Sequence, residues 1–322
     1  MEFRLDEEQQ GLQDTVRRFC AARFPAEKIG ERCSRGVDGA AWREMAGLGL
    51  FGVLGGEGLG VVEGAIAFEQ LGAHLVNGPA LWTTLAGRYV DGAATGERRA
   101  GGIADADADE DPILVEHAAE IDALLLLRAD GVYLCEGSDL PRCEPLAPLD
   151  PLTPVGRCDA LPSGVRVGSV ADAAWLRRAG TVLCGAMLLG VSEAALEASR
   201  RYALDREQFG VPIGSFQAVQ HLLADMYVRT ALARSATYAA AAALDDPLVG
   251  DPLRACAAAK LLAGEAAVEN ARVAIQIHGG TGFTWEMLPN YLLKRAWVLE
   301  NAFGDSHAHA LAIGESLEGS LA

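Results

Sequence analysis

The chain of 322 residues has few of the features that would direct a protein to a membrane, the cell exterior or a nucleic acid. No unbroken apolar run is long enough to span a bilayer, although half of the residues are hydrophobic. The first residues, Met-Glu-Phe-Arg-Leu-Asp-Glu-Glu, lack the basic and then apolar segments of a signal peptide. Positive charge is scarce, and the net charge of −17 argues against nucleic acid or anionic membrane as a partner.

The cysteines lack any CxxC spacing. The seven residues are irregularly placed, at positions 20, 33, 135, 143, 158, 184 and 256. An odd number at such spacing is typical of buried, reduced thiols in the cytosol. We therefore expect free cysteines and a cytoplasmic protein.

Metal-binding patterns are present only as fragments. Asp105, Asp107, Asp109 and Glu116 imitate part of a calcium loop, but Glu110 stands where that loop requires glycine. The pair formed by residues 307 and 309, His-x-His, has no third ligand nearby in the sequence. We expect no metal site.

The composition of the sequence and the spacing of its apolar residues change twice along the chain. Residues 1–97 carry apolar residues at helical spacing, with Asp6 as the expected N-cap of the first helix. Residues 98–172 are rich in Asp, Pro and Gly and hold short apolar runs, at 123–128 and 131–135, that predict strands. Residues 173–322 are rich in Ala and Leu and again helical. We expect three domains with these boundaries, mostly α with a small β domain between the helical ones.

Two blocks near the C-terminus are more specific than these patterns. Residues 206–217 read Arg-Glu-Gln-Phe-Gly-Val-Pro-Ile-Gly-Ser-Phe-Gln, and residues 276–283 read Gln-Ile-His-Gly-Gly-Thr-Gly-Phe. In this order and spacing they resemble the corresponding blocks of acyl-CoA dehydrogenases, flavoenzymes that desaturate acyl-CoA thioesters. The resemblance implies an N-terminal helical domain, a middle β domain that is shorter than usual here, and a C-terminal four-helix bundle.

The same resemblance implies roles in holding FAD. In the family, one FAD is shared by two subunits, and the neighbouring subunit grips its adenine and pyrophosphate end. The residues that match this grip are Arg206, Gln208, Phe209, Phe216, Gln217, Gln276, Gly279 and Gly280. Their chemistry suits the role, because arginine offers a forked donor to phosphate, phenylalanine offers apolar surface, and glycine lets a ligand approach the backbone.

The residues that such a subunit needs for its own flavin and substrate are missing. Phe303 and Gly180 occupy the two positions at which the family carries its catalytic glutamate, and neither side chain can accept a proton. The β domain of the family also carries a Trp-x-Thr or Trp-x-Ser element that faces the flavin, whereas residues 98–172 contain no tryptophan. Trp82 begins a superficial match, but it lies earlier, in a helical context. Glu300 is the one candidate for a relocated base, since it could share a helix face with Phe303.

This split between retained and missing residues leads to one hypothesis and two alternatives. The chain resembles the degenerate subunit of bacterial heterotetrameric (α₂β₂) acyl-CoA dehydrogenases that act on CoA thioesters of steroid side chains. That resemblance implies a non-catalytic or half-site subunit, with FAD shared at the interface with a full-length partner that binds most of the acyl-CoA. The alternatives are an active homo-oligomer that uses Glu300, and a flavin-free scaffold or acyl-CoA-binding protein.

Overall fold

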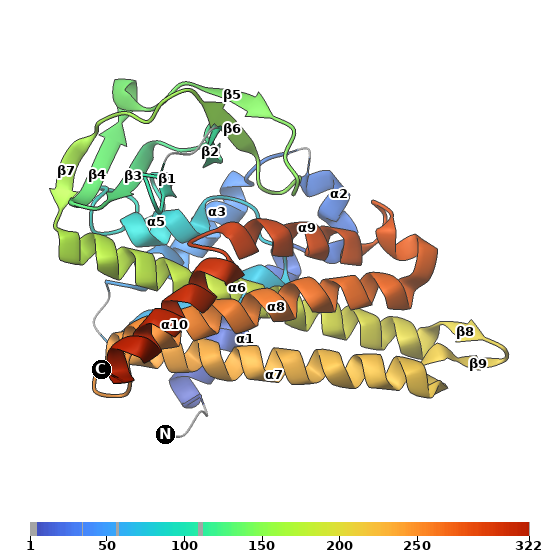
Figure 1. Cartoon of the computed structure of the whole chain (residues 1–322). Helices are drawn as coiled ribbons and strands as arrows, with labels where there is room; N and C mark the ends of the chain where they lie inside the picture. The colour runs from blue at the N-terminus through green and yellow to red at the C-terminus, as the bar shows by residue number, and fades with distance from the viewer. Residues whose placement is uncertain (1–4, 34, 56–57, 109–111, 322) are drawn as a thin grey trace.

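In chain order, helices precede and follow a short β region in the computed structural model, which describes residues 5–33, 35–55, 58–108 and 112–321 (Figure 1). The N-terminal helices are α1 (Glu7–Arg23), α2 (Ile29–Arg32), α3 (Gly39–Gly47), α4 (Val61–Ala73) and α5 (Ala80–Ala86). The C-terminal helices are α6 (Val170–Asp205), α7 (Gln217–Asp245), α8 (Pro252–His278), α9 (Leu288–Asn301) and α10 (Ser306–Leu321). This order confirms the predicted fold class.

Local signals in the sequence fix the start of several helices. Asp6 caps α1, because its side chain accepts the N–H of Gln9 while the Gln9 side chain accepts the N–H of Asp6. Ser169 and Asp172 form the same reciprocal pair at the start of α6. The glycine-rich turn after α8 ends that helix in a 3₁₀ segment, Gly279–Phe283.

The β region consists of two small sheets that lie over α5 and α6 in Figure 1. The first has the order β1-β3-β4-β7, with β1 and β3 parallel and the other pairs antiparallel. The second is antiparallel, with the order β2-β6-β5. The strands are β1 (Ala100–Ile103), β2 (Ile113–Glu116), β3 (Ala123–Arg128), β4 (Gly131–Glu136), β5 (Cys143–Leu146), β6 (Val155–Cys158) and β7 (Val165–Gly168). The two runs predicted as strands are β3 and β4.

Helix α6 is the central helix of the core, and it packs against α4, α7, α8 and α9. Every residue from 179 to 192 is buried, so this part of the helix is covered on all sides. By length and composition α6 could cross a membrane even without an unbroken apolar run, since a window of 18 residues within it has a mean hydropathy of 1.6. However, 83% of that window is buried inside the protein, as expected of a core helix.

Helices α4 and α6 cross at two glycines. A Cβ built on Gly72 would overlap the backbone of Met187, and a Cβ on Gly190 would overlap the backbone of Glu69. Only hydrogen fits at either position without moving a helix. This close crossing fixes α4, and with it the N-terminal helical part, against the bundle.

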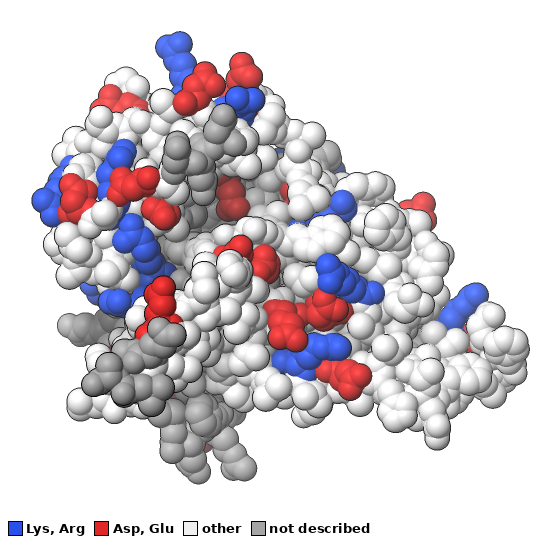
Figure 2. Space-filling model, in the orientation of Figure 1, with Lys and Arg blue, Asp and Glu red and all other residues white. Residues whose placement is uncertain are grey.

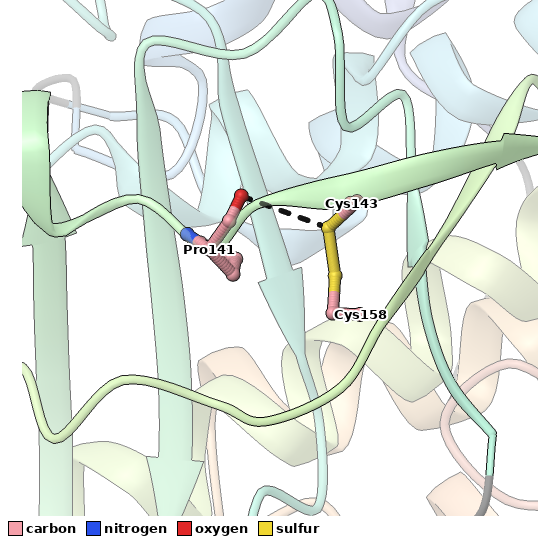
Figure 3. The surroundings of a disulfide bond; sticks show 3 residues. All are labelled: Pro141, Cys143 and Cys158. Carbon is pink, nitrogen blue, oxygen red and sulfur yellow. Dashed lines mark hydrogen bonds between the residues drawn. A yellow bond between two sulfur atoms is a disulfide. The ribbon is translucent and has the colours of Figure 1, made fainter.

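One cysteine pair corrects the expectation of free thiols. Cys143 of β5 and Cys158 of β6 form a disulfide, while the other five cysteines are free (Figure 3). The antiparallel register places the two residues directly opposite each other, with 4.4 Å between their Cα atoms. The spacing of 15 residues between the two cysteines did not predict this disulfide, because the pairing depends on strand register rather than on a local motif.

Candidate functional site

The two positions at which the family carries its base lie against each other. Phe303 follows α9, and its ring occupies the space that any side chain at Gly180 of α6 would need, because a Cβ there would overlap the ring. On another side the Phe303 ring stacks on Trp82 of α5, with 4.9 Å between the ring centroids and 28° between the planes. An aromatic pair therefore fills this place, and neither ring can accept a proton.

The loop that carries Phe303 is held from two directions. Lys260 of α8 is 1% exposed and donates hydrogen bonds to the carbonyl oxygens of Glu300 (2.7 Å) and Gly304 (2.8 Å). The Nε2 atom of His309 lies 3.0 Å from the carbonyl oxygen of Phe303. Burial lowers the pKa of both Lys260 and His309. These contacts hold Phe303 at a φ of 57°, in the left-handed region that non-glycine residues seldom adopt.

Glu300 has a structural contact of its own. Its Oε1 accepts a hydrogen bond of 2.8 Å from the backbone N–H of Ser306, at the start of α10. The Glu300 side chain also lies against α8, because a Cβ atom built on Gly264 would be 3.3 Å from the Glu300 Cγ. The carboxylate is thus engaged in capping α10, and Glu300 does not line the cavities beside Phe303 that are described below.

The residues that match the family's FAD grip lie at the opposite end of the molecule. Helices α6 and α7 are joined there by a projecting hairpin of β8 (Glu207–Gln208) and β9 (Val211–Pro212) (Figure 1). The end of α8 is tied to the end of α6, because the rings of Tyr202 and His278 stack at 4.1 Å. This contact brings the second motif beside the first. All eight matching residues are exposed: Arg206, Gln208, Phe209, Phe216, Gln217, Gln276, Gly279 and Gly280.

Several side chains and glycines at this end of the bundle are open to a ligand or to another chain. Within the described residues the Arg206 guanidinium makes no hydrogen bond or ion pair, whereas Arg200 is paired with Glu197. The Phe209 side chain is 94% exposed and packs edge-on against Phe216 at 6.2 Å. A Cβ on Gly279 or Gly280 would meet no atom within 4 Å, so their backbone faces open space. In Figure 2 this end is mostly uncharged surface, and more of the visible charges lie over the β region and the middle of the bundle.

A groove of about 560 Å³ lies beside Phe303, between the β region and the end of α9. Its described lining contains no Lys or Arg, but it contains Asp105, Glu116 and Asp150. The phosphates of a flavin dinucleotide or of CoA would meet carboxylates here and no cation. The residues present therefore fit a role in gripping FAD at the hairpin end, and do not fit a complete flavin site within this chain.

A buried polar cluster beside this groove was missed by the sequence analysis. Arg295 of α9 forms an ion pair with Asp150, with 2.5 Å between Nε and Oδ2, and both residues are almost fully buried. The Thr153 hydroxyl donates to the same carboxylate oxygen at 2.8 Å. Glu116 of β2 lies nearby, and burial raises the pKa of its carboxyl. The partners are far apart in the sequence, and no local motif connects them.

No metal site was expected, and the described residues contain no group of three or more His, Cys, Asp or Glu that could hold an ion. Asp109 and Glu110 of the incomplete calcium pattern lie outside the described residues.

Comparison with protein families gives two matches. The model of the acyl-CoA dehydrogenase N-terminal domain matches residues 6–99, and the model of the acyl-CoA dehydrogenase C-terminal domain matches residues 178–318. The β region lies between these two matches. Residues of both candidate areas, Phe303 as well as the hairpin, fall within the C-terminal match.

Two mycobacterial proteins are similar over most of this chain. Acyl-CoA dehydrogenase IpdE2 of Mycobacterium tuberculosis is 33% identical over 315 residues, which cover 90% of this chain and 91% of that protein. Acyl-CoA dehydrogenase FadE34 of the same organism is 35% identical over 83% of this chain, which spans only 41% of FadE34's length.

Solved structures agree with these matches. A chain of the ChsE4–ChsE5 complex from Mycobacterium tuberculosis superposes with a TM-score of 0.87 at 27% identity, covering 99% of each chain. A chain of the Tcur3481–Tcur3483 steroid ACAD variant superposes with a TM-score of 0.86 at 24% identity over 98% of this chain and 99% of that chain, a level at which the likeness concerns the fold. The chain belongs to the acyl-CoA dehydrogenase family.

Proposed function

We propose that this chain is the non-catalytic, half-site subunit of a heteromeric FAD-dependent acyl-CoA dehydrogenase. A complete partner subunit supplies the base and the flavin pocket, and this chain grips the adenine and pyrophosphate end of the shared FAD. The observation that carries the proposal is the Phe303 ring, which fills the place of both family base positions and packs against Trp82. A positioned base contributes roughly 10²–10⁴-fold to proton abstraction, so its loss removes most of the activity of the chain's own centre.

The exposed end of the bundle supports the second half of the proposal. Within the described part of the chain the Arg206 guanidinium has no partner, so its fork is open to bidentate contact with phosphate. Phe209 and Phe216 offer apolar surface to an adenine ring or to the partner chain. Gly279 and Gly280 have open space where a side chain would stand, which lets a ligand approach the backbone. A surface of this kind is useful only when a second chain brings the rest of the flavin to it.

The proposed reaction is the α,β-desaturation of an acyl-CoA, for which bound FAD supplies the hydride acceptor. We infer that the α-proton is taken by the partner subunit, since Phe303 and Gly180 occupy the two family base positions of this chain. The likeness to a chain of the ChsE4–ChsE5 complex favours a heteromer. The likeness to a chain of the Tcur3481–Tcur3483 steroid enzyme favours a CoA thioester of a steroid side chain as the substrate. The location that we propose is cytoplasmic.

The flavin content of the purified chain tests this proposal. Alone, the chain should be colourless or poorly soluble, because the apolar groups of the hairpin end would be exposed. Expressed with its complete partner, it should give a yellow α₂β₂ complex with about one FAD per heterodimer. A homomeric preparation with one FAD per chain and turnover of acyl-CoA would instead establish the homo-oligomer that uses Glu300. A preparation that stays colourless with every partner would favour the scaffold alternative.

A further inference from the structure

A small, partly open cavity adjoins the groove near Phe303. It measures about 50 Å³, and its apolar lining includes Leu81, Met187 and Leu299. Its polar lining includes Glu116 and Arg295. Both the cavity and the groove are lined by Trp82, Glu116, Thr153, Val298, Ala302 and Phe303, so the two spaces share a common wall.

Arg295 brings an unused donor to this cavity. The residue is 3% exposed, its Nε donates to Asp150, and its Nη1 donates to the carbonyl oxygen of Val76 at 3.0 Å. Within the described residues its buried Nη2 has no hydrogen-bond partner. Asp150 cannot easily serve it as well, because that carboxylate also accepts from Thr153 and from the backbone of Leu152. Buried donors are nearly always paired, so the unpaired Nη2 calls for an acceptor atom in the cavity.

Glu116 also lines the cavity and can take part in binding. Its position on β2 places it in the lining of both spaces. Burial raises the pKa of its carboxyl, whose oxygens can accept a hydrogen bond from a ligand hydroxyl. The neighbouring His117 ring is already engaged with Glu120, with 2.8 Å between Nδ1 and Oε2.

The charge balance selects an uncharged ligand. Asp150 already neutralises Arg295, the only Lys or Arg in the described lining of the two spaces. Asp105 and Glu116 add further acidic groups. A carboxylate or phosphate would therefore lie among more acids than bases at low dielectric, whereas a hydroxyl or keto oxygen accepts from Nη2 without adding charge.

The two spaces suit two parts of such a ligand, a small polar end in the cavity and a larger apolar body in the groove. A cavity of 50 Å³ is about a third of the ~150 Å³ that accommodates benzene, so it takes only a few atoms. The groove of 560 Å³ is large enough for a compact ring system. Three of its lining side chains, Leu114, Leu146 and Leu149, are 43%, 41% and 50% exposed, which offers an apolar bed.

We propose that the groove and cavity bind a compact, uncharged apolar molecule with one hydroxyl or keto oxygen. The oxygen lies between Arg295 Nη2 and the Glu116 carboxyl, and the apolar body covers Leu114, Leu146 and Leu149. This site does not involve the hairpin end of the bundle or FAD. It would give the closed catalytic centre of the chain a binding role separate from the half-site function.

The test uses the full chain and a probe with a rigid apolar body, 1-adamantanol, measured by isothermal titration and ligand-observed NMR. Saturable binding is expected, at least ten-fold tighter than that of 1-adamantanecarboxylate, which has the same skeleton and a negative charge. Equal affinity of the two probes, or no saturable binding of the alcohol, which would leave a cavity that holds water only, overturns the proposal.

Two variants locate the binding. Glu116→Leu should weaken alcohol binding about ten-fold and reduce the preference for alcohol over carboxylate, because one acid is removed while Arg295 remains. Leu149→Asp should weaken binding at least as much by placing a charge in the groove. The matched control is Leu59→Asp, since Leu59 is 48% exposed and does not line the groove. The control should bind the alcohol as the wild type does. If Glu116→Leu and Leu149→Asp also bind it as the wild type does, while circular dichroism shows them folded, the proposed site is wrong.

Discussion

The hairpin end of the bundle and the pocket around Phe303 belong to the same family pattern but differ in state. At the hairpin end the matching residues are present and exposed, and the Arg206 guanidinium has no partner within the described chain. In the pocket the matching residues have been replaced, and the space is filled by the rings of Phe303 and Trp82. This difference is what we expect if, as we propose, the chain has lost its own centre and kept the surface that a neighbouring centre needs.

The physical requirements of the two regions explain how they can change independently. The pocket is held by buried contacts, such as those of Lys260 with the loop around Phe303, so its replacements had to fit into a packed interior. The hairpin residues make few contacts within the chain, so the stability of the fold does not require them. Their presence in the family order points to a contact outside the chain.

Substitutions of two buried glycines of α6 should have the largest effect. Gly190→Ala forces a methyl group into the backbone of α4, which cannot move without separating the helices, and we expect a loss of roughly 1–3 kcal/mol or more in unfolding free energy. Gly180→Ala meets the Phe303 ring instead. Its cost should vanish in a Phe303→Ala background, because the space is then free and alanine favours the helix by up to about 1 kcal/mol.

Urea unfolding of the single and double variants measures both effects as a double-mutant cycle. If the cost of Gly180→Ala were the same with and without the Phe303 ring, that ring would not fill the place of the missing base. The Gly190→Ala cost, in contrast, should not change when Phe303 is replaced.

Phe303→Glu restores the family residue at one position and tests whether the pocket is closed to chemistry. At pH 7 the variant should be less stable than Phe303→Leu by roughly 1–3 kcal/mol, because an unpaired carboxylate enters an apolar setting. Burial raises the pKa of such a carboxyl in the folded state, so the penalty is present above that pKa and shrinks as the pH falls through it. Chemical unfolding at pH 5 and pH 7 checks the sign.

The same variant should create no second active site in the complex. The groove beside position 303 has no described Lys or Arg for a flavin pyrophosphate, and the Trp-x-Thr element is missing. Steady-state turnover and FAD content per heterodimer should therefore stay at their wild-type values, after correction for any loss of folded protein. A doubling of either quantity would mean that only one residue separates this pocket from activity.

Glu300→Gln should have the smallest effect. The substituted side chain can still accept the Ser306 N–H through its amide oxygen, so the cap of α10 is largely kept and the stability change should stay below about 1 kcal/mol. The kcat of the complex should be unchanged. A fall of 100-fold or more with FAD still bound, about 2.7 kcal/mol of barrier, would identify Glu300 as the base of an active centre in this chain.

The sequence predicted what depends on local pattern or on a long motif. The helical–β–helical order, the Asp6 cap and strands β3 and β4 follow from spacing and composition. The family follows from the two C-terminal blocks. These features need no knowledge of how distant segments pack.

The features that were missed depend on contacts between distant segments. Trp82 was recognised as helical, but its stacking on Phe303 joins residues more than two hundred positions apart. The Asp150–Arg295 pair and the Cys143–Cys158 disulfide depend on domain packing and on strand register.

The most direct test of the account is the affinity of the apo-complex for FAD in two arginine variants of this chain. Arg206→Ala should weaken FAD binding about ten- to a hundred-fold, because it removes a charge-assisted hydrogen bond to phosphate worth roughly 1.5–3 kcal/mol. Arg200→Ala, on the same helix end but paired with Glu197, should leave the affinity unchanged. Equal affinities for the wild type and Arg206→Ala would contradict the claim that this chain holds part of its partner's flavin.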